Sequence, residues 1–357
     1  MPFKDRWAPR HDYHKLDLAF IVDCTGSMGE YIRQAQKHVI SISETISRTA
    51  YNVRLALVEY RDHPPQDKSF VTRVHDFTSD VKEMKVWVDK MSASGGGDCP
   101  ESVADAIFKA CKLGYREDAT KMCVLIADAP PHGLGFAHDG FPNGCPDNHD
   151  PLASCHVMAE KGITLYTIGC EPSVDSFRDF LVGMAAITGG QYVPLHSANV
   201  MSKMIIDGAL EEVSLEKLMG YVDDFVQMEI FRRKQEQKQV AVGNLAESLN
   251  KYLNLNNNRC QQLRLGEKTL DVSSNNSEKY SSMKSMKQAR ELFKKSKNQA
   301  KGLTEVKGAQ PEIAEDQTIS FFQAKRLLRK SLSRQKIPVT HDEIENQIVI
   351  CFQQMAL

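Results

Sequence analysis

An apolar stretch that ends in a short polar motif constrains this chain more than any other feature. Residues 16–22 are mostly apolar and lead directly into the motif D-C-T-G-S at positions 23–27. This pattern predicts a buried strand that ends in a carboxylate and two hydroxyls and then opens a helix. In an extended turn, the oxygens of Asp23, Thr25 and Ser27 can point to one place, which suits Mg²⁺ or another hard divalent ion. The rim of an α/β sheet is where ligands bind.

Strand and helix patterns alternate from residue 16 to about 195. Near-continuous apolar strands that alternate with helices predict a mostly parallel sheet covered on both faces, a doubly wound α/β domain over residues 16–200. The predicted strands are 16–22, 53–60, 71–77 (an edge partner), 122–127, 163–168 and 191–195. The predicted helices are 31–50, 81–91, 101–113, 152–161 and 174–187.

The sequence changes in character on either side of this domain. Helical spacing of apolar residues predicts an α-helical extension over 201–265, and Ser, Asn and charged residues predict a flexible linker over 266–284. The remaining predicted segments are an N-terminal arm at 1–15 and a basic helical tail at 285–357, with helices at 286–303, 321–332 and 344–355.

The net charge of −1 hides an asymmetry between the two parts of the chain. Residues 231–357 carry 23 basic and 13 acidic residues, a net +10, whereas residues 1–230 carry 22 basic and 33 acidic residues, a net −11. The acidic part suits a cation site. We expect the basic helices to be solvated or to face a partner, with an anionic partner or weak membrane-surface contact for 321–332. No recognition module for a specific nucleic acid accompanies them.

Three features of the sequence predict where the protein resides in the cell. The first 15 residues have no apolar signal segment, and no apolar run approaches the roughly 18 residues of a membrane span. The nine cysteines are odd in number and scattered, which is typical of reduced thiols rather than a disulfide framework. We therefore expect a cytoplasmic protein.

Three predicted strand ends or nearby loops carry an acid. Asp23 follows the first strand, Asp128 closes the strand at 122–127, and Asp98 lies on the glycine-rich loop 95–98. Because the carboxyl ends of neighbouring central strands converge, these acids can meet Thr25 and Ser27 at one site. An oxygen-only set of this kind predicts Mg²⁺, with Mn²⁺ or Ca²⁺ as alternatives, and no His or Cys pair at zinc spacing surrounds it.

At these motifs the chain resembles the von Willebrand factor type A domain over about residues 16–200. The metal-ion-dependent adhesion site of that family has a D-x-[ST]-x-S motif after the first strand, a ligand from a middle loop and an aspartate after a later strand. The loops at 60–64 (Y-R-D-H-P) and 140–146 (G-F-P-N-G-C-P) resemble those of A domains attached to eukaryotic α-type protein kinases. The resemblance implies binding through the metal, commonly by a partner's acidic side chain, and no turnover.

Asp98 departs from many adhesive members of the family, which have a threonine at this place. Three carboxylates around a divalent ion leave a formal charge of −1, so the ion attracts an incoming acid less. Three alternatives follow. Asp98 contacts the ion only through water, or the site is mainly structural, or the partner's ligand is not acidic.

Less specific interpretations compete with some of these assignments. Asp23, Thr25 and Ser27 could form only a helix cap, but Asp98 and Asp128 favour a metal site. The His and Asp residues of loop 132–150 are more typical of a solvated loop than of a second metal site. Cys24 and Cys99 are more typical of small apolar residues than of redox groups.

Enzyme templates fail at required residues. No phosphate-binding G-x-x-x-x-G-K-[ST] run occurs, Thr25 stands where a G-x-S-x-G elbow needs glycine, and kinase signatures are absent. We therefore expect a non-enzymatic, metal-dependent protein-binding module. The alternatives are a targeting or regulatory part of an α-type kinase system without its own kinase domain and, less favoured, a metal-dependent phosphohydrolase that uses Asp23 and Asp128.

Overall fold

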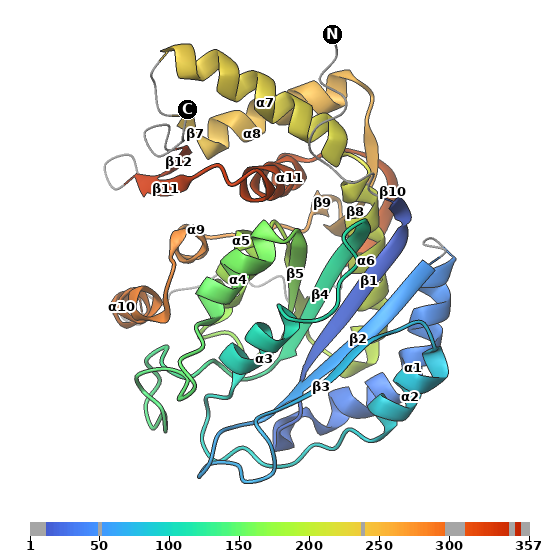
Figure 1. Ribbon diagram of the computed structural model, residues 1–357, viewed down its shortest axis with the longest axis vertical. Helices are drawn as coiled ribbons and strands as arrows, with labels where there is room; N and C mark the ends of the chain where they lie inside the picture. The colour runs from blue at the N-terminus through green and yellow to red at the C-terminus, as the bar shows by residue number, and fades with distance from the viewer. Residues whose placement is uncertain (1–11, 49–51, 237–239, 297–310, 343–346, 351–357) are drawn as a thin grey trace.

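A computed structural model describes residues 12–48, 52–236, 240–296, 311–342 and 347–350. At its centre lies a six-stranded sheet of order β3-β2-β1-β4-β5-β6 (Figure 1). Every neighbouring pair is parallel except β2 and the edge strand β3, which are antiparallel. The strands are β1 (Asp12–Asp23), β2 (Asn52–Tyr60), β3 (Thr72–Thr78), β4 (Ala119–Ala127), β5 (Ile163–Cys170) and β6 (Tyr192–Leu195).

Helices cover both faces of this sheet. Alternate side chains of β1 enter two different cores, with Leu18 and Phe20 in one and Ala19 and Ile21 in the other. The first core is closed by α1 (Gly29–Ser47), α2 (Val81–Asp89) and α6 (Met201–Glu216), and the second by α3 (Val103–Ala110), α4 (Pro151–Glu160) and α5 (Arg178–Ile187). Strands buried on both faces need apolar residues at nearly every position, which is why the continuous apolar runs predicted them. The predicted doubly wound α/β fold is confirmed.

A third apolar core belongs to the C-terminal half of the chain. Its main helices are α7 (Met219–Glu236), α8 (Val242–Leu255) and α11 (Phe321–Arg334), at the top of Figure 1. Two small sheets lie beside them. One is β10 (Glu312–Thr318), β8 (Arg259–Leu265) and β9 (Lys268–Thr269), and the other is β11 (Val339–Asp342), β12 (Gln347–Ile350) and β7 (Val240–Ala241).

Two predictions about the C-terminal half are wrong. The segment 266–284, expected to be a flexible linker, contains β9 and α9 (Asn275–Ser282), and Tyr280 of α9 packs edge-on against Phe180 of α5 at 5.5 Å. Its serines reflect helix capping rather than disorder, because Ser274 and Ser277 form a capping box. Residues 347–350, expected within a final helix, form β12 instead.

The remaining boundaries differ less. Residues 12–15 of the expected arm belong to β1, and α10 (Met286–Ser296) is the start of the helix expected at 286–303. Residues 1–11, 297–310, 343–346 and 351–357 lie outside the described residues.

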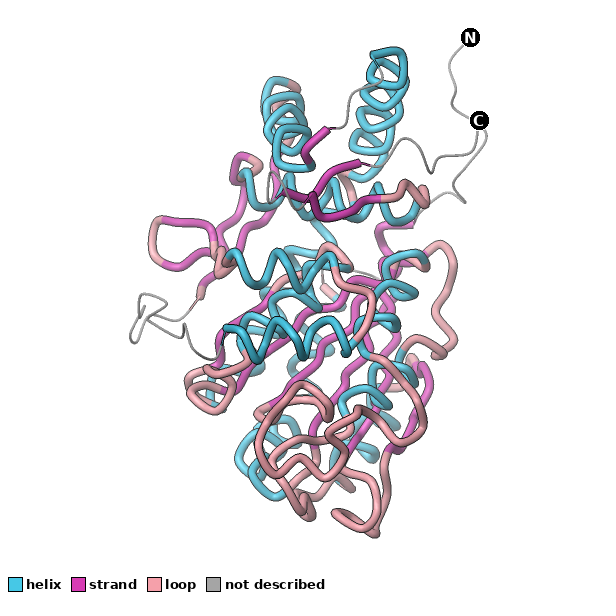
Figure 2. The backbone as a smooth tube through the Cα atoms, turned by 90° about the vertical axis from the view of Figure 1, so that its left-hand side faces the viewer, coloured by secondary structure: helices cyan, strands magenta, loops and turns pink. Residues whose placement is uncertain are grey.

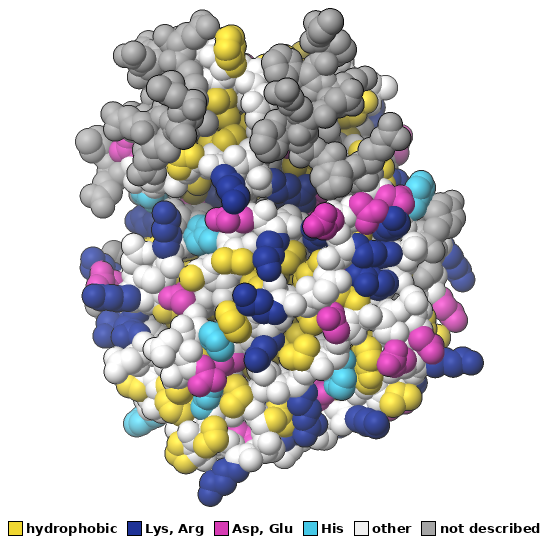
Figure 3. Space-filling view, in the orientation of Figure 1, with side chains coloured by type: hydrophobic (Ala, Val, Ile, Leu, Met, Phe, Trp, Pro, Cys, Tyr) yellow, Lys and Arg dark blue, Asp and Glu magenta, His cyan; other side chains and the backbone are white. Residues whose placement is uncertain are grey.

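Two basic residues of α11, Arg326 and Lys330, are buried and do not face solvent as expected. Arg326 donates to Glu211 of α6 at 2.7 Å, and Lys330 pairs with Glu216 at 3.0 Å and also contacts Glu212. The acids of α6 lie more than 100 residues earlier, so the spacing of basic residues in α11 could not reveal them. On the face shown in Figure 3, the remaining Lys and Arg side chains are interspersed with acids.

Long connections gather at the carboxyl ends of the strands. Figure 2 shows these loops at the end of the sheet opposite α7 and α8. The connection from β4 to α4 has no helix or strand over residues 128–150. The predicted ligands therefore lie at this rim, among loops that come from separate parts of the chain.

Candidate metal centre

The motif after β1 brings three side-chain oxygens together. Asp23 Oδ1 accepts hydrogen bonds from the backbone N–H of Thr25 at 2.8 Å and from Thr25 Oγ1 at 2.7 Å. Thr25 Oγ1 lies 3.5 Å from Ser27 Oγ. Asp23 and Thr25 are buried whereas Ser27 is exposed. The motif therefore presents one anchored carboxylate and a hydroxyl that an approaching molecule can reach.

Asp128 joins this group from the adjacent strand. It follows β4, which pairs with β1 up to Val22 and Ile126. Burial raises the pKa of Asp128, although a hydrogen bond from Ser27 opposes the rise. Burial, and then the negative charge of Asp128, raises the pKa of Asp23 to about 7. The contacts thus bring together Asp23, Thr25, Ser27 and Asp128 of the predicted set.

Asp98 makes its contacts slightly further along the rim. Its Oδ2 accepts a hydrogen bond from the backbone N–H of Gly140 at 2.5 Å. It also groups with Asp62 and His132, with one possible ligand atom from each lying within 4.8 Å of the others. Burial and the neighbouring Asp62 raise the pKa of Asp98 against the effect of the Gly140 bond. Direct binding of the ion by Asp98 stays a prediction.

Glu101 is the acid that sequence reasoning missed. It lies in the same loop as Asp98 but is only 3% exposed. Burial and the charges of Asp23 and other nearby acids raise its pKa to about 10. A Cβ added to Gly96 would lie 2.7 Å from Glu101 Oε1 and 3.4 Å from the Thr25 Cβ, so the glycine loop closes over both residues. The signal in the sequence was a second acid three positions after Asp98.

Three carboxylates at this rim each have a buried oxygen without a hydrogen-bond partner in the described part of the chain. Among the described residues, Asp23 Oδ2, Glu101 Oε2 and Asp128 Oδ1 have no hydrogen-bond partner. None of the three carboxylates forms a salt bridge with a described residue. Unpaired buried carboxylates are costly, and native proteins rarely retain them without a ligand. The donor set of carboxylates and hydroxyls fits a hard divalent ion.

Loop 132–150 is more ordered than predicted. His132 is buried between Asp62, at 2.6 Å from its Nε2, and Asp139, at 2.8 Å from its Nδ1. Cys145 is buried as well, whereas His138 and Asp147 are exposed, as expected for a solvated loop. The expectation therefore holds only for part of the loop. Its folded part borders a cavity of about 450 Å³ that α10 closes on the other side.

Comparisons with known proteins agree with this geometry. Residues 17–133 match the family model of the von Willebrand factor A domain, a segment that contains the five predicted ligands and Glu101. A protein of Acanthamoeba polyphaga mimivirus described as an ariadne-like RING finger protein is 30% identical over 216 residues, which is 59% of this chain and 21% of that protein. The α-protein kinase vwkA of Dictyostelium discoideum is 30% identical over 136 residues, 37% of this chain and 21% of the kinase.

The similarity to solved structures is weaker. The pilus adhesin SpaC of Lactobacillus rhamnosus GG superposes with a TM-score of 0.44 and 10% identity over 56% of this chain and 31% of the adhesin. Within the described residues, no helix is both long enough and apolar enough to span a membrane.

The chain spans about a fifth of the length of the mimivirus protein and about a fifth of the length of vwkA. The match covers β1 to the start of loop 128–150, with the strand order and the rim motif in place. Residues 17–133 of this α/β domain therefore match a von Willebrand factor A domain, and 136 residues of the chain are similar in sequence to part of the kinase vwkA.

Proposed function

We propose that this chain is a protein-binding module in which Asp23, Thr25, Ser27 and Asp128 hold a divalent cation at the sheet rim. The observation that carries this proposal is the set of buried, unpartnered oxygens on Asp23, Glu101 and Asp128. A cation beside them would neutralise the charge that burial makes costly. Mg²⁺ is the expected ion, with Mn²⁺ or Ca²⁺ as alternatives.

Each residue has a distinct part in the proposed site. The backbone N–H and hydroxyl of Thr25 fix the carboxylate of Asp23, so its second oxygen is free for the ion. Ser27 is exposed and bounds the open side. When bound, the ion supplies an electrophilic position that an oxygen of a protein partner, such as an acidic side chain, can complete. Glu101 lies on the buried side and Asp98 further along the rim.

Binding, rather than catalysis, is favoured by the relatives. This chain aligns with about a fifth of each of two proteins whose names describe different activities, a RING finger protein and a protein kinase. Similarity to parts of proteins with such different activities supports a role in recognition. We propose the cytoplasm as its location, because the eight cysteines of the described residues are all free thiols.

A second candidate function is targeting or regulation within an α-type kinase system. The 30% identity to vwkA over 136 residues favours it. Copurification of a kinase with the full chain, lost in the variant Asp23→Ala, would support this narrower function. Equal recovery of the kinase with wild-type protein and variant would argue against a role for the rim site in it.

Calorimetric titration of Mg²⁺ and Mn²⁺ into EDTA-treated protein tests the proposal. Wild-type protein should bind saturably, and Asp23→Ala should lose binding while it keeps its fold by circular dichroism. Glu83→Gln removes an exposed carboxylate from α2 and should bind like wild type. Absence of saturable binding in wild type would refute the metal mechanism. Mg²⁺-dependent hydrolysis of a generic phosphate ester that Asp23→Ala abolishes would favour the phosphohydrolase alternative instead.

A further inference from the structure

A second cluster of metal-ligating side chains lies away from the proposed rim ligands. It contains His63, which follows β2, Asp105 in the first turn of α3, and Cys145 in loop 128–150. All three are buried, at 5%, 2% and 9% exposure. Nitrogen, carboxylate oxygen and sulfur from three separate segments meet here, which is a different chemistry from the oxygen-only rim.

The spacing of the three ligand atoms fits a small ion. His63 Nε2 lies 3.0 Å from Asp105 Oδ2, Cys145 Sγ lies 3.2 Å from the same oxygen, and the sulfur lies 3.8 Å from the nitrogen. A point equidistant from three atoms with these separations lies about 2 Å from each of them, close to the length of zinc bonds to nitrogen, oxygen and sulfur. The mixed set with a thiolate selects zinc over magnesium or calcium.

Neighbouring groups hold these ligands in orientation. His149 Nδ1 lies 2.8 Å from Asp105 Oδ1, so the carboxylate can use its other oxygen, Oδ2, toward a metal. The His149 ring stacks on Phe108 at 3.9 Å. Burial raises the pKa of the Cys145 thiol, and the nearby backbone N–H groups of His149 and Asp147 oppose that rise. Such outer partners are typical of metal ligands, whose orientation they fix.

The position of the cluster gives an ion a structural purpose. Loop 128–150 runs between β4 and α4 without a helix or strand, and connections of this length are uncommon unless something orders them. His63 and Asp105 belong to the body of the domain, whereas Cys145 and His149 belong to the loop. A shared ion would join the two.

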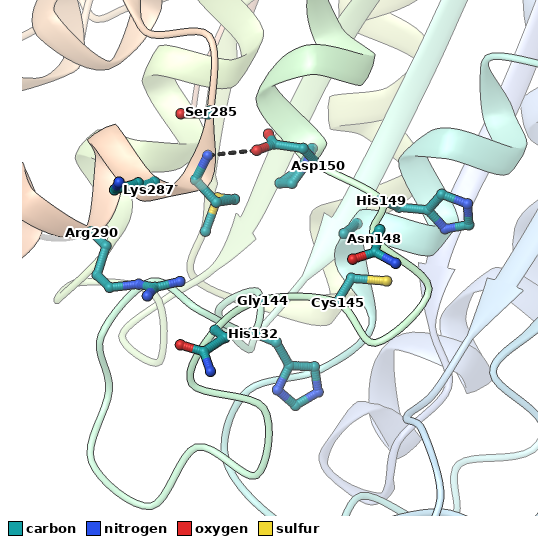
Figure 4. A pocket seen from close by; sticks show the side chains of 13 residues that line it. His132, Gly144, Cys145, Asn148, His149, Asp150, Ser285, Lys287 and Arg290 are labelled. Atoms are coloured by element: carbon teal, nitrogen blue, oxygen red, sulfur yellow. Dashed lines mark hydrogen bonds between the residues drawn. The ribbon is translucent and has the colours of Figure 1, made fainter.

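We propose that His63, Asp105 and Cys145 bind a zinc ion that fastens loop 128–150 to the A domain. Cys145 and His149 also line the cavity of about 450 Å³, so water or another small ligand can reach a fourth coordination position. Figure 4 shows these two residues on the opposite side of the cavity from Lys287 and Arg290 of α10. The proposal goes beyond the rim site, because it uses none of the rim ligands.

Zinc content and cobalt substitution test the proposal with the full chain. Wild-type protein should bind one zinc per chain, and Co²⁺ in its place should give a thiolate-to-cobalt charge-transfer band. Cys145→Ser should lose both signals, whereas Cys99→Ser, which removes an exposed thiol, should keep them. His149→Gln, at an orienting position, should retain the band and weaken zinc affinity by about 10–100-fold.

Two outcomes would overturn the site. One is wild-type protein that binds neither zinc nor cobalt stoichiometrically, which would leave a metal-free hydrogen-bond network around Asp105. The other is a cobalt band in Cys145→Ser equal to that of wild type. Asp23→Ala should keep zinc and Cys145→Ser should keep Mg²⁺ binding, so failure at one site can be told from failure at the other.

Discussion

Two groups of acids with buried oxygens in this molecule differ in what neutralises them. At the sheet rim, Asp23, Glu101 and Asp128 have oxygens without partners. On α6, by contrast, Glu211, Glu212 and Glu216 are also buried but pair with bases of α11, namely Arg326, Lys330 and Arg334. The chain itself neutralises the acids of α6, whereas the rim acids have no basic partner among the described residues, which agrees with the cation proposed above.

Removal of a base from the paired group should have the largest effect. Arg326→Met leaves the buried Glu211 without its basic partner, although Glu212 keeps Lys330, so the free energy of unfolding should fall by about 3–5 kcal/mol. Urea unfolding measures the change. The matched control is Arg33→Met, because the Arg33–Glu30 pair is exposed and its loss should have a much smaller effect. Equal losses in the two variants would contradict the structural role of the α6–α11 pairs.

Binding of a divalent ion to the unpaired rim acids should raise the free energy of unfolding. The gain should be of the same order as the loss expected for Arg326→Met. A ligand that binds only the folded state at 100 times its dissociation constant adds about 2.7 kcal/mol. We expect that gain on addition of Mg²⁺ to wild-type protein and no gain in Asp23→Asn. Thermal or urea unfolding with and without EDTA measures it. A gain of the same size in Asp23→Asn would place the ion elsewhere.

In metal-free protein the rim acids should make stability fall as pH rises. Burial raises the pKa of folded Asp23 to about 7 from an ordinary 3.8, so between these values only the folded state keeps the proton. The stabilisation is complete below about pH 4 and is lost as pH passes about 7. Relative to Asp23→Asn in EDTA, wild type should lose at least about 1.4 kcal/mol over this range, the equivalent of one pKa unit. Parallel stability curves for the two proteins would contradict the raised pKa.

The smallest effect should come from a substitution in the N-terminal cap of α11. It tests how much of the stability comes from the helix end itself and how much from the α6–α11 ion pairs. Ser320 and Gln323 form a capping box at its start. Ser320→Ala should therefore lower the free energy of unfolding by about 1 kcal/mol. Ser248→Ala, at a half-buried position within α8 where the hydroxyl donates to the Asn244 carbonyl of the same helix, should change it little. A loss from Ser320→Ala as large as that from Arg326→Met would mean that the cap, not the ion pairs, fastens α11.

Much of the α/β domain could be predicted because its signals are local. The strands are buried on both faces, so their apolar runs were visible, and the D-x-T-x-S motif lies within five consecutive residues at a strand end. Asp128 was identified by the same rule. Asp98 and Glu101 are three positions apart in one loop, and only the fold of that loop shows that Glu101 is the acid covered beside Thr25.

The C-terminal half was harder to predict for the same physical reason. Basic residues at helical spacing in α11 looked solvated, because their acidic partners lie on α6, more than 100 residues away. Serines and asparagines in 266–284 suggested a linker. Instead, Ser274 and Ser277 cap α9, and this helix packs against α5. The composition of a segment shows how polar it is, but it does not show which other part of the chain will pack against it.

The sequence by itself determined the fold class and the motif at the sheet rim, since periodicity and strand-end chemistry depend on neighbouring residues. Only the tertiary structure decided which acids are paired and which remain free. It alone brought His63 and Asp105 to Cys145, from which they are 82 and 40 positions away along the chain. Charge and coordination act through space, so they depend on contacts that no local pattern records.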